Sequence, residues 1–280
     1  MRLTDESALV REAYPERYAE VAVFVTELGG SAGIVLVIAV LYWLTRRRES
    51  ALVASYAVAG ISAVILVKSL LGMPRPPEEV FIAEMVDDPY GFPSGHAFMA
   101  VTVYGGLLVT FDRVRDRLAA AGVATLVVAI SLSRIVLGFH YLGDVVVGAA
   151  MGLAFLLAIH RLVGGEPWRG FALGGLVALP AVSVSGADPY ALVGFGAAVG
   201  GLVGSLWLED VPDLRSRIEG AVLSVGGIGF LVAVRSLEAV LADLTAVATV
   251  ALHAVLVAGV LLGPAALGSL EADVLESTRR

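Results

Sequence analysis

The chain has 280 residues, of which 58% are hydrophobic and 16% are charged, and its formal net charge is −7. Soluble domains carry about 25% charged residues, so the composition indicates a membrane protein, and the acidic balance argues against nucleic acid as a partner. The absence of cysteine excludes disulfides, thiolate catalysis and cysteine-ligated metals.

The first 18 residues are charged and are expected to form a surface tail, not a cleavable signal peptide. Long apolar segments follow, each near the length of about 20 residues that a transmembrane helix needs. The nine segments lie at 20–44, 50–71, 95–111, 117–138, 141–162, 169–186, 190–207, 217–235 and 243–268. The sequence therefore predicts an all-α fold, a polytopic transmembrane helical bundle.

Arginine residues concentrate in alternate loops between these segments. Cytoplasmic loops of membrane proteins are enriched in Lys and Arg. The alternate loops and the C-terminus contain Arg46, Arg47, Arg48, Arg113, Arg115, Arg117, Arg161, Arg169, Arg215, Arg217, Arg279 and Arg280. The pattern predicts a multi-pass protein of the cell membrane with a cytoplasmic C-terminus and an extracytoplasmic N-terminus. Arg2, Arg11 and Arg17 of the tail disagree mildly, but acidic residues accompany them.

Three polar stretches interrupt the apolar pattern at the predicted outer ends of segments two to five. They read KSLLGMPRP from Lys68 to Pro76, PSGH from Pro93 to His96, and SRIVLGFHYLGD from Ser133 to Asp144. Hydropathy alone places the three stretches at one depth of the membrane. The first stretch also contains the single lysine of a chain that has 19 basic residues.

The cations of these stretches indicate an anion-binding site. Lys68, Arg75 and Arg134 bring three positive charges to one depth, and a charge within a membrane segment is costly and usually functional. Arginine guanidinium groups match phosphate oxygens in bidentate fashion. Ser94 and Gly95 stand where a helix begins, and its free N–H groups and dipole favour an anion. The pattern therefore predicts a phosphate site on the extracytoplasmic face.

Two histidines complete the predicted site. His140 and Asp144 are four residues apart, so they share one helix face, and the carboxylate can fix the imidazole tautomer. A histidine held in this way could attack phosphorus. His96 then suits the acid that protonates the leaving oxygen and the base that activates water. Three cations and backbone amides would neutralise the developing charge, so neither a metal nor another cofactor is expected.

These residues resemble the three-part signature of the type 2 phosphatidic acid phosphatase (PAP2) superfamily, which also includes vanadium haloperoxidases and glucose-6-phosphatase. The matching positions are Lys68, Arg75-Pro76, Pro93-Ser94-Gly95-His96, Ser133-Arg134, His140 and Asp144. The resemblance covers about residues 20–165. It implies a PAP2-like core of about six helices, which about three C-terminal helices extend in this chain.

The resemblance also implies a role for each site residue. His140 would be the nucleophile, Asp144 its orienting partner, and His96 the general acid and base. The phosphate oxygens would be held by Lys68, Arg75, Ser94, Gly95 and Arg134. The expected organisation is a surface tail at 1–18, a catalytic transmembrane core at 19–165, and a transmembrane extension at 166–280. The acidic loop 77–90 is interpreted as a solvated loop, with a lid as the alternative.

The function expected from these features is a membrane phosphatase that acts on a lipid phosphate and forms a phosphohistidine. Phosphatidate, phosphatidylglycerophosphate and polyprenyl diphosphate are the candidate substrates, and the bilayer is the other expected partner. A phosphotransferase that uses the same pocket is an alternative. A transporter of an anion or a lipid is a third reading, and a haloperoxidase is weaker because those relatives are soluble. The sequence does not decide the oligomeric state.

Overall fold

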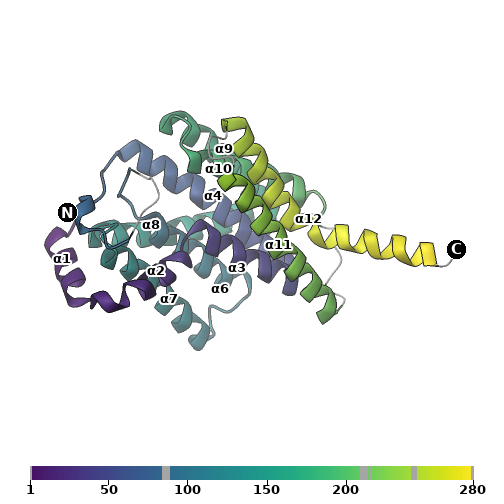
Figure 1. Cartoon of the computed structure of the whole chain (residues 1–280), viewed down its shortest axis with the longest axis horizontal. Helices are drawn as coiled ribbons and strands as arrows, with labels where there is room; N and C mark the ends of the chain where they lie inside the picture. Colours follow the sequence, from purple (N-terminus) through teal and green to yellow (C-terminus); the bar gives the residue numbers. More distant parts are fainter. Residues whose placement is uncertain (1, 84–88, 209–213, 215, 241–244, 279–280) are drawn as a thin grey trace.

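The computed structural model describes residues 2–83, 89–208, 214, 216–240 and 245–278 (Figure 1). Within these ranges every regular element is a helix, and one isolated antiparallel bridge joins Pro74 to Tyr90. The predicted all-α fold class is therefore confirmed. The arginine positions 215, 279 and 280, which entered the orientation prediction, lie outside the described residues.

The helices follow one another along the chain with short connections. The α-helices are α1 (Thr4–Ala13), α2 (Ala19–Glu27), α3 (Ser31–Leu44), α4 (Arg47–Leu71), α5 (Gly95–Ala100), α6 (Gly106–Thr110), α7 (Arg117–Val136), α8 (Leu142–Val163), α9 (Pro167–Ser185), α10 (Pro189–Ser205), α11 (Arg217–Val240) and α12 (Ala246–Thr278). Two 3-10 turns, η1 (Glu16–Tyr18) and η2 (Glu78–Val80), and one π-helical stretch, η3 (Val101–Gly105), complete the set. Because η3 continues α5 into α6, these three elements form one helical segment.

Six of the described helices are long and apolar enough to cross a membrane: α4, α7, α8, α9, α11 and the part of α12 that ends at Gly268. The predicted segment 20–44 is not one straight helix, because α2 and α3 meet at a bend of 53°. The predicted segments 95–111 and 190–207 form shorter apolar helices, Gly95–Thr110 and Pro189–Ser205. The nine apolar segments are therefore present, but only six of them are unbroken long spans.

The bend between α2 and α3 falls on a pair of glycines. Gly30 precedes α3 with extended backbone (φ −80°, ψ 165°), so the helix stops before it and starts again after it. Close packing there also requires glycine, since a Cβ at Gly33 would lie 2.1 Å from the carbonyl oxygen of Glu27. The bend directs this part of the chain toward the start of α5.

Helix α4 lies at the centre of the bundle, between the N-terminal helices and α9 and α10 (Figure 1). Small residues allow the close approach of α9, because a Cβ at Gly174 would lie 3.2 Å from the backbone of Ala59. Lipid tails are as apolar as leucine, so helices in a membrane associate mainly by such packing. α4 thereby provides a rigid support for Lys68 in its last turn.

Two pairs of glycines spaced by four residues are packing positions. A Cβ at Gly148 of α8 would lie 2.5 Å from the Ser94 carbonyl oxygen, and one at Gly152 would lie 2.6 Å from that of Phe98. The second pair, Gly196 and Gly200 of α10, packs in the same way against the backbone of α12. The first pair brings the start of α5 directly onto α8.

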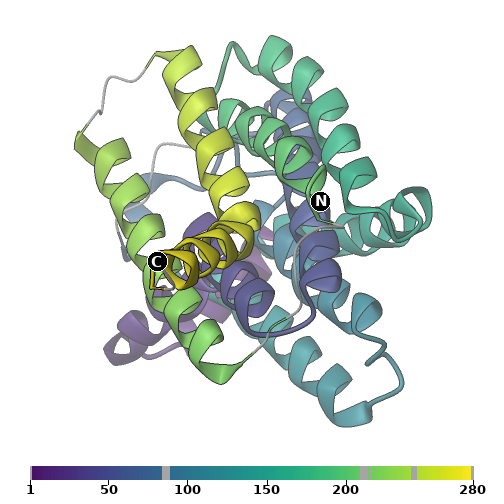
Figure 2. The same cartoon turned by 90° about the vertical axis from the view of Figure 1, so that its right-hand side faces the viewer.

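The C-terminal helices pack against α3 and α4. The end of α12 projects away from the other helices in Figure 1 and points toward the viewer in Figure 2. Tyr42 Oη donates to the carbonyl oxygen of Leu261 at 2.8 Å. A buried ion pair joins Arg47 of α4 to Glu219 of α11, with 3.3 Å between nitrogen and oxygen. These contacts connect the extension to α3 and to α4, which carries Lys68.

Candidate active site

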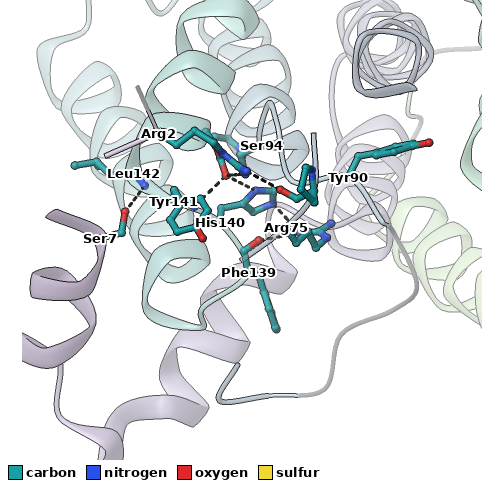
Figure 3. A network of polar contacts seen from close by, with 12 residues as sticks. Arg2, Ser7, Arg75, Tyr90, Ser94, Phe139, His140, Tyr141 and Leu142 are labelled. Atoms are coloured by element: carbon teal, nitrogen blue, oxygen red, sulfur yellow. Dashed lines mark hydrogen bonds and ion pairs between the residues drawn. The ribbon is translucent and has the colours of Figure 1, made fainter. Parts of the chain in front are cut away.

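The three polar stretches meet at one end of the bundle and are joined by hydrogen bonds (Figure 3). The Ser94 N–H donates to the carbonyl oxygen of Asp144 at 2.9 Å, which links the second stretch to the third. Arg75 Nη1 donates to the carbonyl oxygen of Phe139 at 3.0 Å, which links the first to the third. The common depth that hydropathy predicted for these stretches is therefore a direct spatial contact.

Lys68 lies beside the first turn of α5. Its side chain is only 3% exposed, and Nζ donates to the carbonyl oxygen of Tyr90 at 2.9 Å. A Cβ at Gly95 would lie 3.9 Å from Lys68 Cε, so the bare backbone of Gly95 faces the lysine. Ser94 caps the helix, and its Oγ accepts from the Ala97 N–H at 3.5 Å. An ammonium group and a helix N-terminus thus lie together, which favours an anion.

Arg134 and His140 are placed by a tight turn after α7. The carbonyl oxygen of Arg134 accepts from the N–H groups of Phe139 at 3.1 Å and His140 at 3.2 Å. Gly138 makes this turn possible because its φ is +80°, in the region that favours glycine. A Cβ at Gly138 would also lie 2.1 Å from the carbonyl oxygen of Val80. The turn holds both side chains in fixed positions.

Arg134 is buried at the same end of the bundle. Its Nη1 donates to Thr26 Oγ1 of α2 at 3.0 Å, and its guanidinium carbon lies 4.6 Å from the ring centroid of Phe139. The side chain is 4% exposed. A guanidinium held by a hydroxyl group and a ring face has little freedom, so it offers a preorganised positive charge.

The contacts of His140 define which ring nitrogen carries the proton. Nε2 lies 3.1 Å from Nη1 of Arg75. A guanidinium only donates, so Nε2 accepts and has its lone pair available, and the proton of the neutral ring is on Nδ1. Nδ1 faces Asp144, with 3.6 Å to Oδ2. This is the tautomer that a histidine nucleophile needs.

His140 is held in its neutral form by its surroundings. Burial lowers the pKa of His140 well below its usual value, and the positive charges of Arg134, Arg75 and Lys68 lower it further. A hydrogen bond with the backbone of Gly91 acts in the opposite direction but is the smallest of these effects. The imidazole is therefore an unprotonated base at neutral pH.

His96 lies where α5 begins, against the bend between α2 and α3. A Cβ at Gly29 would lie 3.4 Å from His96 Cδ2, and one at Gly30 would lie 3.5 Å from Nε2. The ring is also close enough to His140 and to the three cations for their charges to act on it. The structure therefore brings together all the predicted site residues, which are Lys68, Arg75, Ser94, Gly95, His96, Arg134, His140 and Asp144.

The first part of the acidic loop packs over the turn that carries His140. The rings of Phe81 and Phe139 meet edge to face, with 5.4 Å between their centroids. The Ile82 N–H donates to the carbonyl oxygen of Leu137 at 3.3 Å. The loop residues Glu84, Asp87 and Asp88 lie outside the described residues, so the lid interpretation stays a prediction.

One residue that contacts this site, Arg2, was not predicted from the sequence. The N-terminal tail was expected on the surface, but Arg2 makes an ion pair of 2.7 Å with the completely buried carboxylate of Asp144. The one available signal was indirect: a carboxylate next to a membrane segment requires a positive partner. Nothing in the spacing of the tail residues identifies Arg2 as that partner.

Comparison with known proteins shows which family the site region resembles. Residues 48–168 match the family model described as the PAP2 superfamily. All the predicted site residues lie within this range. Over these residues the chain matches the PAP2 superfamily, which confirms the resemblance inferred from the sequence. The matched range begins after the bent pair α2 and α3.

Two curated relatives are similar to this chain. Both are named decaprenylphosphoryl-5-phosphoribose phosphatase, from the CDC 1551/Oshkosh and H37Rv strains of Mycobacterium tuberculosis. Each is 37% identical over 129 residues, which cover 44% of this chain and 66% of the relative. The chain thus spans slightly less than two thirds of the length of these relatives. No solved structure gives a significant match.

Proposed function

We propose that this protein is an integral membrane phosphatase that removes a phosphate group from a lipid through a phosphohistidine on His140. The observation that carries the proposal is the state of His140. Its Nε2 lone pair points at the guanidinium of Arg75, and its Nδ1 faces the carboxylate of Asp144. A neutral imidazole with this tautomer, surrounded by cations, is suited to attack a phosphate anion.

In the first step, Nε2 of His140 attacks phosphorus and forms an N–P bond while the bond from phosphorus to the leaving oxygen breaks. The electron pair of that bond goes to the leaving oxygen, which receives a proton from the imidazolium form of His96, a form that the bound phosphate anion stabilises. Asp144 stabilises the positive charge that develops on the imidazole. The contact between Arg75 Nη1 and Nε2 must break before this attack. The guanidinium of Arg75 then binds the phosphate oxygens together with Lys68 and Arg134.

In the second step, His96 accepts a proton from water, and the water oxygen attacks the phosphohistidine. The N–P bond breaks, the electron pair of this bond returns to Nε2 of His140, and inorganic phosphate leaves. The cations and the first N–H groups of α5 neutralise the charge on phosphorus in both steps. The chain's own residues therefore supply the nucleophile, the proton transfers and the charge stabilisation.

The proposed substrate is a lipid phosphate or diphosphate with a polyprenyl or diacylglycerol tail. The site lies at one end of helices that are long enough to cross a membrane, so a head group bound there leaves its tail at the level of the bilayer. The curated relatives carry the name of a decaprenyl-linked phosphoribose phosphatase, which favours a polyprenyl substrate. Phosphatidate, phosphatidylglycerophosphate and polyprenyl diphosphate remain the substrates to compare.

The proposed orientation places this site on the extracytoplasmic face and the C-terminus in the cytoplasm. It rests on the arginine distribution. Because the chain has no cysteine, one introduced cysteine gives a unique label. A membrane-impermeant thiol reagent should label Leu9→Cys in intact cells but label Arg115→Cys only after lysis, since both positions are exposed. The reverse labelling would contradict the orientation.

A substrate panel tests the activity. Purified protein in detergent should release phosphate from at least one of these lipids in the presence of a chelator, and His140→Ala should not. Mass spectrometry with added lipid or sugar alcohols distinguishes hydrolysis from transfer, because a transferase forms a new phosphate ester. If no lipid phosphate is hydrolysed and none is transferred, the proposed function is wrong and the transporter reading gains weight.

A further inference from the structure

Arg2 makes three hydrogen bonds that join separate parts of the site (Figure 3). Its Nε donates to Asp144 Oδ1 at 2.8 Å, and its Nη2 donates to Oδ2 at 2.7 Å. The remaining nitrogen, Nη1, donates to the carbonyl oxygen of Pro74 at 2.7 Å. The guanidinium carbon also lies 4.6 Å from the ring centroid of Tyr141. The side chain of Arg2 thus connects Pro74, which precedes Arg75, to Asp144, which faces His140.

The backbone around Arg2 is fixed as firmly as its side chain. The Gly143 N–H donates to the carbonyl oxygen of Arg2 at 3.0 Å, and the Leu142 N–H donates to Ser7 Oγ at 2.8 Å. Ser7 is completely buried. The first N–H groups of a helix have no partner within it, so the N-terminal segment caps α8 at the point from which Asp144 projects.

The charges require a cation at this position. Asp144 is completely buried, and a buried carboxylate is costly unless it is paired and hydrogen-bonded. Arg2 meets this need with two parallel hydrogen bonds, the strong bidentate arrangement. Oδ2 also accepts from the Tyr141 N–H at 3.0 Å. His140 Nδ1, at 3.6 Å, is the more distant neighbour of the same oxygen.

We propose that Arg2 is a positioning residue, which fixes the carboxylate of Asp144 and limits how much of its charge acts on the imidazole of His140. Arg2 does not touch the reacting phosphorus in this scheme. Its kinetic effect rests on the proposed phosphatase function, but its coupling to His140 through Asp144 does not. Without Arg2, the carboxylate would lose its orientation, and the imidazole beside it would bind a proton more readily.

Kinetics of Arg2→Gln and Arg2→Lys test the positioning role in the full-length protein. We expect Arg2→Gln to lower kcat about 10- to 100-fold, the loss seen when a residue that orients a metal ligand is removed, with little change in KM. Arg2→Lys should recover part of this loss. Arg17→Gln, an exposed arginine of the same N-terminal segment, is the matched control and should retain wild-type kinetics.

A double-variant comparison shows whether Arg2 acts through Asp144. If it does, Arg2→Gln causes no further loss of kcat in a protein that already carries Asp144→Asn. An equal loss in both backgrounds would overturn the proposal, because Arg2 would then act by another route or only support folding. Melting temperatures of all variants, measured in the same detergent, identify losses that reflect unfolding.

Histidine NMR provides a readout that does not depend on turnover. The chain has four histidines, so His→Gln variants can assign the His140 signal. The charged and titratable groups that face His140 are Lys68 of α4, Arg75, His96 of α5, Arg134 of α7 and Asp144 of α8. We expect the titration of His140 to move to higher pH in Arg2→Gln, because the charge of Asp144 is no longer shared.

The two readouts separate the two proposals. A His140 titration that is unchanged in Arg2→Gln would overturn the positioning role, even if the wild-type protein is an active phosphatase. A shifted titration in a protein that releases no phosphate would support the positioning role and contradict the proposed function.

Discussion

Nη1 of Arg75 lies 3.1 Å from Nε2 of His140. The same guanidinium nitrogen donates to the carbonyl oxygen of Phe139, the residue before the histidine. The arginine therefore occupies the position from which the proposed nucleophile must attack. Binding of a phosphate would exchange this nitrogen contact for contacts with phosphate oxygens, so Arg75 is expected to act in both the free and the bound state.

Replacement of Arg75 should weaken phosphate binding according to what the new side chain retains. Arg75→Gln removes the charge, and a hydrogen bond to a charged group contributes about 1.5–3 kcal/mol, so vanadate inhibition should weaken by about 10-fold or more. Arg75→Lys keeps a point charge but loses the planar fork and should be intermediate. Vanadate inhibition constants check this order. Equal inhibition of all three proteins would exclude Arg75 from the phosphate site.

Replacement of His140 should separate chemistry from binding. His140→Ala removes the nucleophile, so phosphate release should fall by at least about 1,000-fold, while vanadate binding by the remaining cations is weakened far less. The wild-type protein, quenched during turnover of a radiolabelled substrate, should contain acid-labile phosphate that the variant lacks. His160→Gln is the control, because His160 lies near the other end of the 22-residue α8 and bonds to Tyr56.

The pH dependence of kcat/KM follows from the lowered pKa of His140. A histidine in water titrates near pH 6.5, but burial and the neighbouring cations keep His140 neutral well below that pH. The acid limb of kcat/KM, which reports the free enzyme, should therefore lie well below pH 6.5. Arg75→Gln removes one of the cations and should move the limb to higher pH. An acid limb at or above pH 6.5 would contradict this electrostatic description.

The same lowered pKa has a consequence for stability. Below about pH 6.5 the unfolded chain protonates this histidine, whereas the folded protein does not. The unfolded state then binds more protons. The contribution of His140 to the free energy of unfolding is therefore fully present above pH 6.5 and decreases as the pH falls below it. Melting temperatures at pH 7.5 and 5.5 should differ less for His140→Gln than for the wild type.

The contact between α5 and α8 should tolerate no side chain at Gly148. The methyl group of Gly148→Ala would lie 2.5 Å from the Ser94 carbonyl oxygen, and overpacking of this kind costs about 1–3 kcal/mol. Both the melting temperature and phosphate release should fall, because Ser94 would be displaced. Gly122→Ala is the matched control: its Cβ meets nothing within 4 Å, and alanine favours a helix by about 0.5–1 kcal/mol. A similar effect of both substitutions would contradict the packing described here.

The residues that lie together here could be predicted from the sequence because charged side chains are rare in an apolar chain and their spacing is restricted by the chemistry. Lys68, Arg75 and Arg134 stand out for this reason, and His140 and Asp144 lie within one helical turn of each other. The bend at Gly29 and Gly30 was not predictable in the same way. A glycine pair is also compatible with a continuous membrane helix, and the packing of His96 against the pair comes from a distant part of the chain.

The role of the N-terminal segment also depends on contacts between distant residues. Arg2 and Asp144 are separated by 142 positions, and no local pattern marks the arginine. The difference between Gly122 and Gly148 is of the same kind. Both are glycines within apolar helices, and only the neighbouring helix determines that one position is crowded and the other is open.

The burial of Lys68 makes the protein suitable for covalent labelling. It is the single lysine of the chain, its side chain is 3% exposed, and its amine is held by the carbonyl oxygen of Tyr90. Amine-reactive reagents therefore have one side-chain target, and the rate of its acylation measures how often this amine becomes accessible. Mass spectrometry of one peptide would then report occupancy of the pocket by any inhibitor, without a substrate or a spectroscopic probe.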